Sequence, residues 1–236
     1  MVARTGCARK TLPFGVVGPG SVEPCVVDRL LAAPLLIALR ALVEWWAAAR
    51  VRGVVIGGVA ASLLGRPRLT GDVDALVIVD EDGWSQFLAA GRPFGIRPRR
   101  ADALAFARRS RVLLLRHEPS GIDLDVSLGA LPFEYEVIAR SRRRRVSGVA
   151  VPLATAEDLI VMKAIAGRPR DIADIEGLRD THPRLDRKRI VGLVREFAAV
   201  LETPSMATEL DRILGPTPRP IRNQAGSRGR RKKAPS

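Results

Sequence analysis

The sequence contains few cysteines, histidines and aromatic residues. Two cysteines, Cys7 and Cys25, and two histidines, His117 and His182, occur among 236 residues, and aromatic residues make up 4%. A structural zinc site uses Cys or His ligands at short, regular spacings, and because the chain has no Cys-x-x-Cys pair we expect no such site. Two cysteines are also too few for the framework of a disulfide-stapled secreted domain, which favours a reduced, cytoplasmic protein.

Long uninterrupted apolar runs are scarce as well. The run from residue 30 to residue 39 is followed by Arg40 and Glu44, and it is much shorter than the roughly 20 residues that span a bilayer. Within residues 1–25, glycines and prolines interrupt the apolar stretch that a signal peptide would need. We therefore expect no membrane segment, and we expect residues 1–26 to form an irregular N-terminal segment.

Acidic residues are outnumbered by basic ones. The chain has 39 Lys and Arg against 25 Asp and Glu, which gives a formal net charge of +14. Seven of the basic residues lie in the tail 216–236, which contains no acid and whose composition predicts disorder. The excess of positive charge favours polyanionic partners such as RNA or nucleotides. The alternative is that much of this charge is solvated and has no ligand.

Hydrophobic periodicity predicts helices and strands in a mixed order. The expected helices cover residues 28–50, 59–65, 80–91, 155–167, 169–180, 186–202 and 205–214. The expected strands cover residues 53–58, 72–79, 111–117, 122–128 and 148–153, with an arginine-rich loop over 92–110. The order indicates an α+β protein, with a core domain at 27–153 in which helices flank a mixed sheet and a helical C-terminal part at 154–215.

Two acids one residue apart open the predicted strand 72–79. Residues i and i+2 of a strand point to the same face, so Asp72 and Asp74 lie side by side. Neighbouring carboxylates repel each other unless a cation joins them, and Mg²⁺ prefers oxygen ligands. The alternative is a pair of solvated acids at the edge of a loop.

Gly57 and Gly58 follow an apolar strand and precede a helical segment. Glycine lets backbone N–H groups approach a ligand closely, and the N-terminus of a helix favours a phosphate. The alternative is a tight turn without a ligand. With Asp72 following Gly58 by 14 residues, the sequence predicts phosphate and metal binding in one compact unit.

A second pair of acids, Asp123 and Asp125, lies on the predicted strand 122–128. A third carboxylate near a metal pair can act as a ligand or accept a proton from an attacking hydroxyl group. The alternative is that these acids lie on the polar, water-facing side of an edge strand.

The segment GGVAASLLGRPRLTGDVD (57–74) together with Asp125 resembles the nucleotidyltransferase superfamily with the DNA polymerase β-like fold. More narrowly, it resembles the bacterial AbiEii-type nucleotidyltransferases, which are toxins of type IV toxin–antitoxin systems, and their uncharacterised relatives. The resemblance covers roughly residues 50–180. It implies that Asp72, Asp74 and Asp125 are catalytic and hold two Mg²⁺ ions, with Asp123 as the alternative to Asp125.

The same resemblance implies a nucleotide site. Lys163 lies mid-helix among apolar residues, where a lysine needs a partner or an anion such as a phosphate. Asp171 and Asp174 lie one helical turn apart and can orient basic groups through ion pairs, the alternative being a structural cluster that joins two helices. The residues expected to bind the nucleotide are Gly57, Gly58, Thr70, Lys163, Arg168 and Asp174, with Lys163 also catalytic and Arg170 as the alternative to Arg168.

The resemblance implies a metal-dependent transfer of a nucleoside monophosphate from a nucleoside triphosphate to a hydroxyl group. In this branch the acceptor is expected to be the tRNA 3′ end, with RNA held by the basic run 140–145 and the tail 216–236, and a cognate antitoxin is the expected protein partner. Two alternatives remain. One is a non-catalytic nucleotide- or partner-binding protein of the same fold, and the other is a nucleic-acid-binding protein that depends on the basic tail.

Overall fold

The computed structural model describes residues 31–215, and the predictions for residues 1–26 and for the tail 216–236 lie outside this range. The helices are α2 (Ala33–Ala49), α3 (Gly57–Leu64), α4 (Trp84–Ala90), α5 (Ala103–Ser110), α6 (Pro132–Arg140), α7 (Ala156–Ala166), α8 (Pro169–Thr181), α9 (Arg187–Val200) and α10 (Ser205–Leu214). The strands are β1 (Gly53–Val55), β2 (Asp72–Val77), β3 (Ile96–Pro98), β4 (Val112–His117), β5 (Ile122–Leu128), β6 (Arg142–Val146) and β7 (Val149–Leu153), and η1 (Glu81–Gly83) and η2 (Arg92–Phe94) are 3-10 turns.

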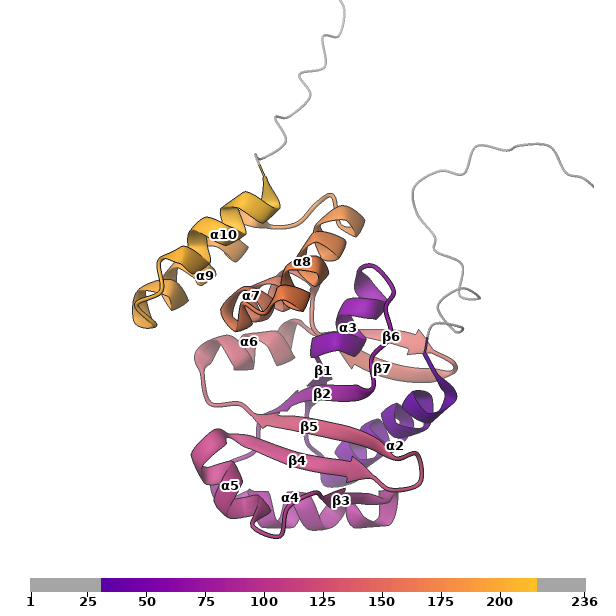
Figure 1. Cartoon of the computed structure of the whole chain (residues 1–236). Coiled ribbons are helices and arrows are strands. Elements are labelled where there is room, and N and C mark those ends of the chain that lie inside the picture. Colours follow the sequence, from indigo (N-terminus) through magenta and orange to yellow (C-terminus); the bar gives the residue numbers. More distant parts are fainter. Residues whose placement is uncertain (1–30, 216–236) are drawn as a thin grey trace, which may run out of the picture.

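The strands form one seven-stranded sheet in the order β3-β4-β5-β2-β1-β7-β6. Strand β2 lies near the middle, parallel to β5 on one side and antiparallel to β1 on the other. The β4–β5 hairpin is antiparallel, as expected from the turn signal between its strands. The mixed sheet with flanking helices confirms the predicted α+β class (Figure 1).

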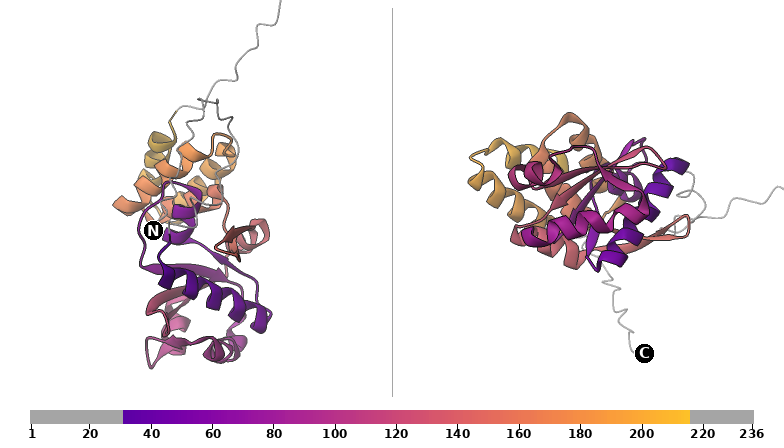
Figure 2. Two further views of the ribbon diagram at one scale, coloured as in Figure 1. Left: turned by 90° about the vertical axis from the view of Figure 1, so that its right-hand side faces the viewer. Right: turned by 90° about the horizontal axis from the view of Figure 1, so that it is seen from below.

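Helices cover the sheet and extend the molecule at one end. Helices α2 and α4 lie behind the sheet, where Trp45 stacks on Phe87 with ring centroids 4.2 Å apart. Helix α2 packs so closely that a Cβ at Gly53 would lie 2.7 Å from the Trp46 ring. Helices α7 to α10 form the separate group at the end of the molecule that Figure 2 shows from a second side, and α3 contacts α7 and α8. None of the helices within residues 31–215 has the length and apolar character needed to cross a bilayer.

The prediction of a loop over 92–110 is wrong, because this segment contains η2, β3 and α5. Ile96 of β3 is buried and pairs with His117 of β4. Ala103 and Ala107 are the buried residues of α5. The basic run 140–145 has regular secondary structure as well. It ends α6 and forms the edge strand β6, whose register with β7 runs from Arg142 to Val146. Strand β3 is ordered by its pairing with β4, which lies beyond α5, whereas β6 pairs with the next strand in the sequence, β7.

Candidate active site

The first turn of helix α3 contacts the carboxylate of Asp74 on β2. Gly57 has φ +62, and a Cβ placed there would lie 1.9 Å from Asp74 Oδ2. The Gly58 N–H donates a hydrogen bond of 3.3 Å to the same oxygen. A side chain at position 57 would be strained by its backbone and would also displace Asp74. The two glycines therefore let the first turn of α3 approach the strand that carries the acids.

Four carboxylates share one face of the sheet. In the parallel register of β2 and β5, Asp72 lies opposite Asp123 and Asp74 lies opposite Asp125. Burial, followed by the charge of Asp72, raises the pKa of Asp74. Burial also raises the pKa of Asp125, and the neighbouring carboxylates act in the same direction against the opposing effect of Arg99. This repulsion is what a bound cation would relieve.

Thr70 lies in the segment that leads into β2. Its hydroxyl group donates to Asp72 Oδ1 at 3.0 Å and lies 3.3 Å from the Asp72 carbonyl oxygen. A Cβ at Gly58 would lie 2.9 Å from the same hydroxyl oxygen, so Thr70 also borders the first turn of α3. Thr70 therefore orients Asp72 and lies beside the glycines with which it was predicted to act.

Two arginines that sequence reasoning did not identify bind the acids of β5. Arg99 donates to Asp123 Oδ2 at 3.0 Å and also pairs with Asp125. Arg116 donates to Asp123 Oδ1 at 2.8 Å. Arg99 was missed because residues 92–110 were predicted to be a loop. The signal that was available is the alternation Ile96-Arg97-Pro98-Arg99, which is typical of a half-buried strand.

Lys163 lies in a buried ion-pair cluster between α7 and α8. Its ammonium group is 2.6 Å from Asp174 Oδ2 and 3.1 Å from Asp171 Oδ1. Arg68 donates two hydrogen bonds to Asp174, at 2.7 and 2.9 Å, and Arg168 Nε lies 2.7 Å from Asp171 Oδ2. Three cations thus face two carboxylates, which leaves the cluster with one excess positive charge.

The ion pairs of this cluster keep Asp171 and Asp174 deprotonated, because they lower the pKa of both carboxyl groups. Burial opposes the charged form of Asp171, but hydrogen bonds from Arg168 and Lys163 outweigh it and lower the pKa. Burial likewise opposes the charged form of Asp174, and hydrogen bonds from Arg68 and Lys163 lower its pKa. Both carboxylates therefore remain charged at neutral pH and join α7 and α8 to the segment before β2.

A cavity of about 230 Å³ lies between Gly57 and this cluster. Gly57, Asp74, Lys163 and Arg168 are among the residues that line it. The Arg168 side chain is 55% exposed, so its guanidinium group is accessible although it pairs with Asp171. The structure thus brings two carboxylates, Asp74 and Glu134, two cations and Gly57 around one small cavity.

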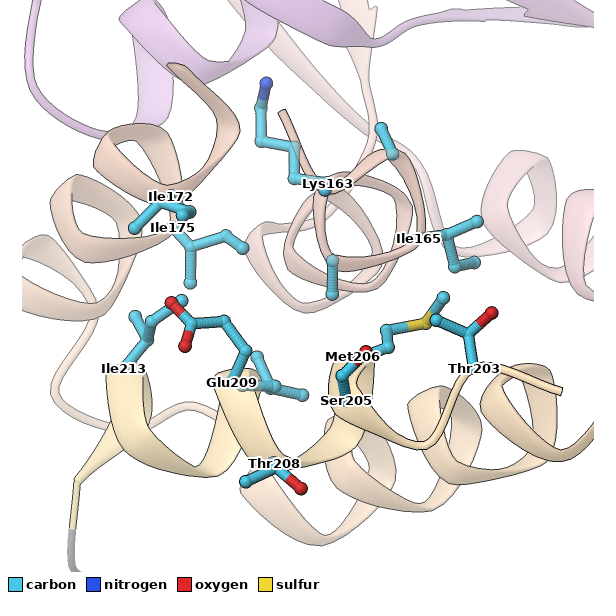
Figure 3. Close-up of a pocket in the computed structure, with 14 residues that line it drawn as sticks. Lys163, Ile165, Ile172, Ile175, Thr203, Ser205, Met206, Thr208, Glu209 and Ile213 are labelled. Atoms are coloured by element: carbon cyan, nitrogen blue, oxygen red, sulfur yellow. The ribbon is translucent and has the colours of Figure 1, made fainter. Parts of the chain in front are cut away.

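A larger cavity, of about 740 Å³, lies between α7, α8 and α10 (Figure 3). Its lining combines apolar side chains, among them Ile172, Ile175, Met206 and Ile213, with polar ones such as Thr203 and Glu209. The Lys163 side chain points away from it (Figure 3). Because none of the sheet carboxylates borders this cavity, we place the candidate active site at the smaller one.

The predicted site residues are distributed over three neighbouring groups. Gly57, Asp74, Lys163 and Arg168 line the small cavity, whereas Asp72 and Asp125 lie on the same sheet face as Asp74. The remaining predicted residues bind other protein groups, since Thr70 contacts Asp72 and Asp174 contacts Arg68 and Lys163. The structure does not bring the alternative, Arg170, into these groups; its side chain is exposed.

The donor set of β2 fits a magnesium ion. Asp72 and Asp74 present carboxylate oxygens on one face of the strand, and burial together with the charge of Asp72 raises the pKa of Asp74. The expected third ligand, Asp125, is held by Arg99. Within residues 31–215, no three His, Cys, Asp or Glu side chains converge as a preformed metal centre. A cation at this face would therefore compete with Arg99 for Asp125.

The fold is that of the nucleotidyltransferases. The solution structure of the antibiotic-resistance factor ANT(2'')-Ia matches 74% of this chain and 97% of its own, with a TM-score of 0.51 and 14% identity. A crystal structure of ANT(2'')-Ia with adenylyl-2''-tobramycin matches 71% of this chain and 99% of its own, with a TM-score of 0.45 and 17% identity. An antigenic nucleotidyltransferase-like protein from Paracoccidioides brasiliensis matches 77% of this chain and 94% of its own, with a TM-score of 0.48 and 15% identity. Neither a protein-family model nor a curated protein matches the sequence.

Proposed function

We propose that the protein transfers a nucleoside monophosphate from a nucleoside triphosphate to a hydroxyl group. The observation that carries this proposal is the contact between the first turn of α3 and Asp74, where Gly57 has no room for a side chain. This contact joins a set of backbone N–H groups suited to phosphate with a pair of carboxylates suited to a cation. The nucleotidyltransferase fold supports the same reaction class.

The charges around the small cavity support binding of a triphosphate. Gly57 lines the cavity at the N-terminus of α3, and Arg168 is accessible from the same cavity. The excess positive charge of the Lys163 cluster favours an anion nearby. In this proposal Asp174 holds Arg68 and Asp171 holds Arg168, and Lys163 pairs with both carboxylates.

The reaction needs a proton acceptor and charge neutralisation. Asp72, Asp74 and Asp125 would hold Mg²⁺, which when bound neutralises charge on the phosphates. The acceptor oxygen forms a bond to the α-phosphorus, the bond from that phosphorus to the bridging oxygen breaks, and pyrophosphate leaves. We assign the proton of the attacking hydroxyl group to Asp125, which lies opposite Asp74 in the register of β2 and β5.

We propose RNA as the acceptor, with the tRNA 3′ end as the first to test. Strand β6 supports this choice, because Arg142, Arg143 and Arg145 are exposed at the edge of the sheet. Arg144 is used within the fold, where it donates to the Leu63 carbonyl oxygen. A role as an AbiEii-type toxin with a cognate antitoxin follows from the motif resemblance and belongs to the same proposal.

The test is incubation of the purified full chain with each labelled nucleoside triphosphate, Mg²⁺ and total tRNA. The double variant Asp72→Ala/Asp74→Ala is compared with Asp82→Ala, which removes an exposed acid of η1. We expect label transfer by the wild type and by Asp82→Ala, and none by the double variant. Transfer that survives in the double variant would contradict the proposal.

A second candidate is a non-catalytic nucleotide-binding protein of this fold. The pairing of Asp125 with Arg99 favours it, because an arginine occupies the carboxylate that the reaction needs. Nucleotide binding measured by calorimetry, without transfer to tRNA or to the protein itself, would favour this candidate over the enzyme.

A further inference from the structure

The large cavity between α7, α8 and α10 has the size and the lining of a small-molecule site. Its volume of about 740 Å³ lies within the range of such pockets, which are mostly apolar and carry a few polar groups. Three of its apolar side chains, Ile165, Ile172 and Met206, are only partly buried. Because removing apolar surface from water is favourable, an apolar ligand in this cavity would be stabilised by contact with these side chains.

Glu209 gives the cavity a negative charge. Among the described residues that line the cavity, Glu209 is the one carboxylate, and its side chain extends from α10 toward Ile175 of α8 (Figure 3). The one cation of this lining, Lys163, directs its ammonium group away from the cavity, where it pairs with Asp171 and Asp174. The charge that a ligand meets inside the cavity is therefore that of a carboxylate.

Arg212 pairs with Glu209 from the same helix, at 2.7 and 3.0 Å. The side chains of Arg212 and Glu209 are 66% and 42% exposed, and exposed ion pairs of this kind contribute little to stability. Arg212 lies outside the lining of the cavity. An ammonium group inside the cavity can therefore share Glu209 with Arg212 or replace it at small cost, whereas a ligand carboxylate would be repelled by Glu209.

The last turn of α7 forms the wall between the large and the small cavity. Lys163 and Ala166 line both cavities. Gly167, which lines the large cavity, ends α7 with φ +61 and precedes Arg168, which lines the small one. A ligand held between α7, α8 and α10 thus contacts the segment that places Lys163 and Arg168 at the candidate active site.

We propose that the large cavity binds a small apolar amine and that this ligand strengthens nucleotide binding at the small cavity. The apolar body packs between α8 and α10, and the ammonium group binds Glu209. The ligand fixes α7 and α8 in the arrangement in which Arg168 faces the small cavity, and two ligands that favour one arrangement raise each other's affinity. The amine site is independent of the proposed nucleotidyl transfer, whereas its effect on the nucleotide rests on that function.

The first experiment compares three probes of the same shape. The probes 4-phenylbutylamine, 4-phenylbutan-1-ol and 4-phenylbutyrate are titrated against the purified full chain, without nucleotide, by ligand-observed NMR. We expect the amine to bind about threefold more tightly than the alcohol or better, and the carboxylate to bind most weakly. Equal binding of the three probes, or tightest binding of the carboxylate, would overturn the proposal.

Substitutions locate the bound amine. Glu209→Gln removes the charge, so we expect it to reduce the affinity for the amine to that for the alcohol and to leave the alcohol unaffected. Glu81→Gln is the matched control, because Glu81 is 55% exposed and pairs with Arg108, and it should bind the amine like the wild type. Unchanged amine binding in Glu209→Gln would overturn the proposal, and its loss in Asp72→Ala/Asp74→Ala would place the amine at the acids of β2 instead.

The second experiment measures the effect on the nucleotide. ATP with Mg²⁺ is titrated by calorimetry into the full chain, with and without saturating 4-phenylbutylamine. We expect the wild type to bind ATP about fivefold more tightly with the amine, and Glu209→Gln to show no difference. An unchanged affinity for ATP in the wild type, or an equal change in both proteins, would overturn the effect on the nucleotide.

The two experiments separate this inference from the proposed function. ATP that binds neither with nor without the amine contradicts the proposed function, while the dependence of amine binding on Glu209 is decided by the first experiment alone. Nucleotidyl transfer by the wild type, with amine binding that does not depend on Glu209, contradicts the inference and leaves the proposed function intact.

Discussion

At the scale of single residues, Asp74 is held in an unfavourable charged state. Burial and Asp72 raise its pKa, while the Gly58 N–H is the backbone donor that opposes this shift. Because this pKa is raised, Asp74 in the folded protein binds a proton at pH values above 3.8, the ordinary pKa of the group. The charged Asp74 therefore lowers stability at neutral pH, and this penalty disappears as the pH falls and the group becomes protonated.

We expect Asp74→Asn to stabilise the protein and to reduce nucleotidyl transfer. The amide oxygen can still accept the Gly58 hydrogen bond, but the charge repulsion is gone. The expected gain at pH 7 is a rise in Tm of about 2–4 °C, equivalent to about 1 kcal/mol, with transfer falling on the order of 10²-fold. Thermal unfolding at pH 7 and pH 4 checks this, with Asp82→Asn as the control. An equal gain at both pH values would contradict the charge explanation.

Lys163 presents the opposite case, because its partners are stabilised in their charged forms. The lowered pKa values of Asp171 and Asp174 contribute stability that is present above their ordinary value of 3.8 and is lost as the pH falls through the folded values. We expect Lys163→Met to cost about 3 kcal/mol, because two buried carboxylates lose a shared cation.

The measurement is urea unfolding of Lys163→Met, Asp171→Asn and the double variant. If Lys163 mainly stabilises the cluster, the double variant should lose less stability than the sum of the single variants. Strictly additive losses together with a large change in nucleotide KM would instead indicate direct phosphate binding by Lys163.

At the scale of elements, the junction of β1 and α3 depends on Gly57. We expect Gly57→Ala to lose nucleotide binding, because the new Cβ would displace Asp74. We also expect its free energy of unfolding to fall by about 1–2 kcal/mol, because alanine disfavours the left-handed backbone at this position. Gly148 is a matched control, since it has φ +82 and nothing lies within 4 Å of its added Cβ. Gly148→Ala should therefore show the backbone cost alone. Nucleotide titration and thermal unfolding of both variants check this, and equal binding by both would exclude the contact.

At the scale of the whole molecule, the distribution of charge separates RNA binding from nucleotide chemistry. Residues 216–236 hold seven basic residues of the 39 in the chain and no acid. We expect deletion of this tail to weaken binding of a long RNA and to reduce its salt dependence, while hydrolysis or transfer of the nucleoside triphosphate with a dinucleotide acceptor persists. A filter-binding salt titration beside the transfer assay measures both. Loss of nucleotide chemistry on deletion would show that the tail acts at the site itself.

Much of the local structure was determined by the sequence alone. The positions of α2, α3, β2, the β4–β5 hairpin and α7 to α10 were predicted within a few residues, because apolar periodicity, glycines and caps act over short distances. The Thr155 hydroxyl group, for example, accepts the Asp158 N–H as expected of a cap. The Gly57–Gly58 turn and the acids of β2 were likewise visible without coordinates.

Only the tertiary structure decided which charged groups meet. The register of β2 with β5 places Asp125 beside Asp74, and the pairing of β3 with β4 delivers Arg99 to Asp125. The same holds for Lys163, whose partners belong to another helix. Strand β3 pairs with β4 across the intervening helix α5, whereas the polar edge strand β6 pairs with the next strand, β7. Sequence periodicity reports which face of an element is apolar, whereas the choice of ion-pair partner depends on how distant elements pack.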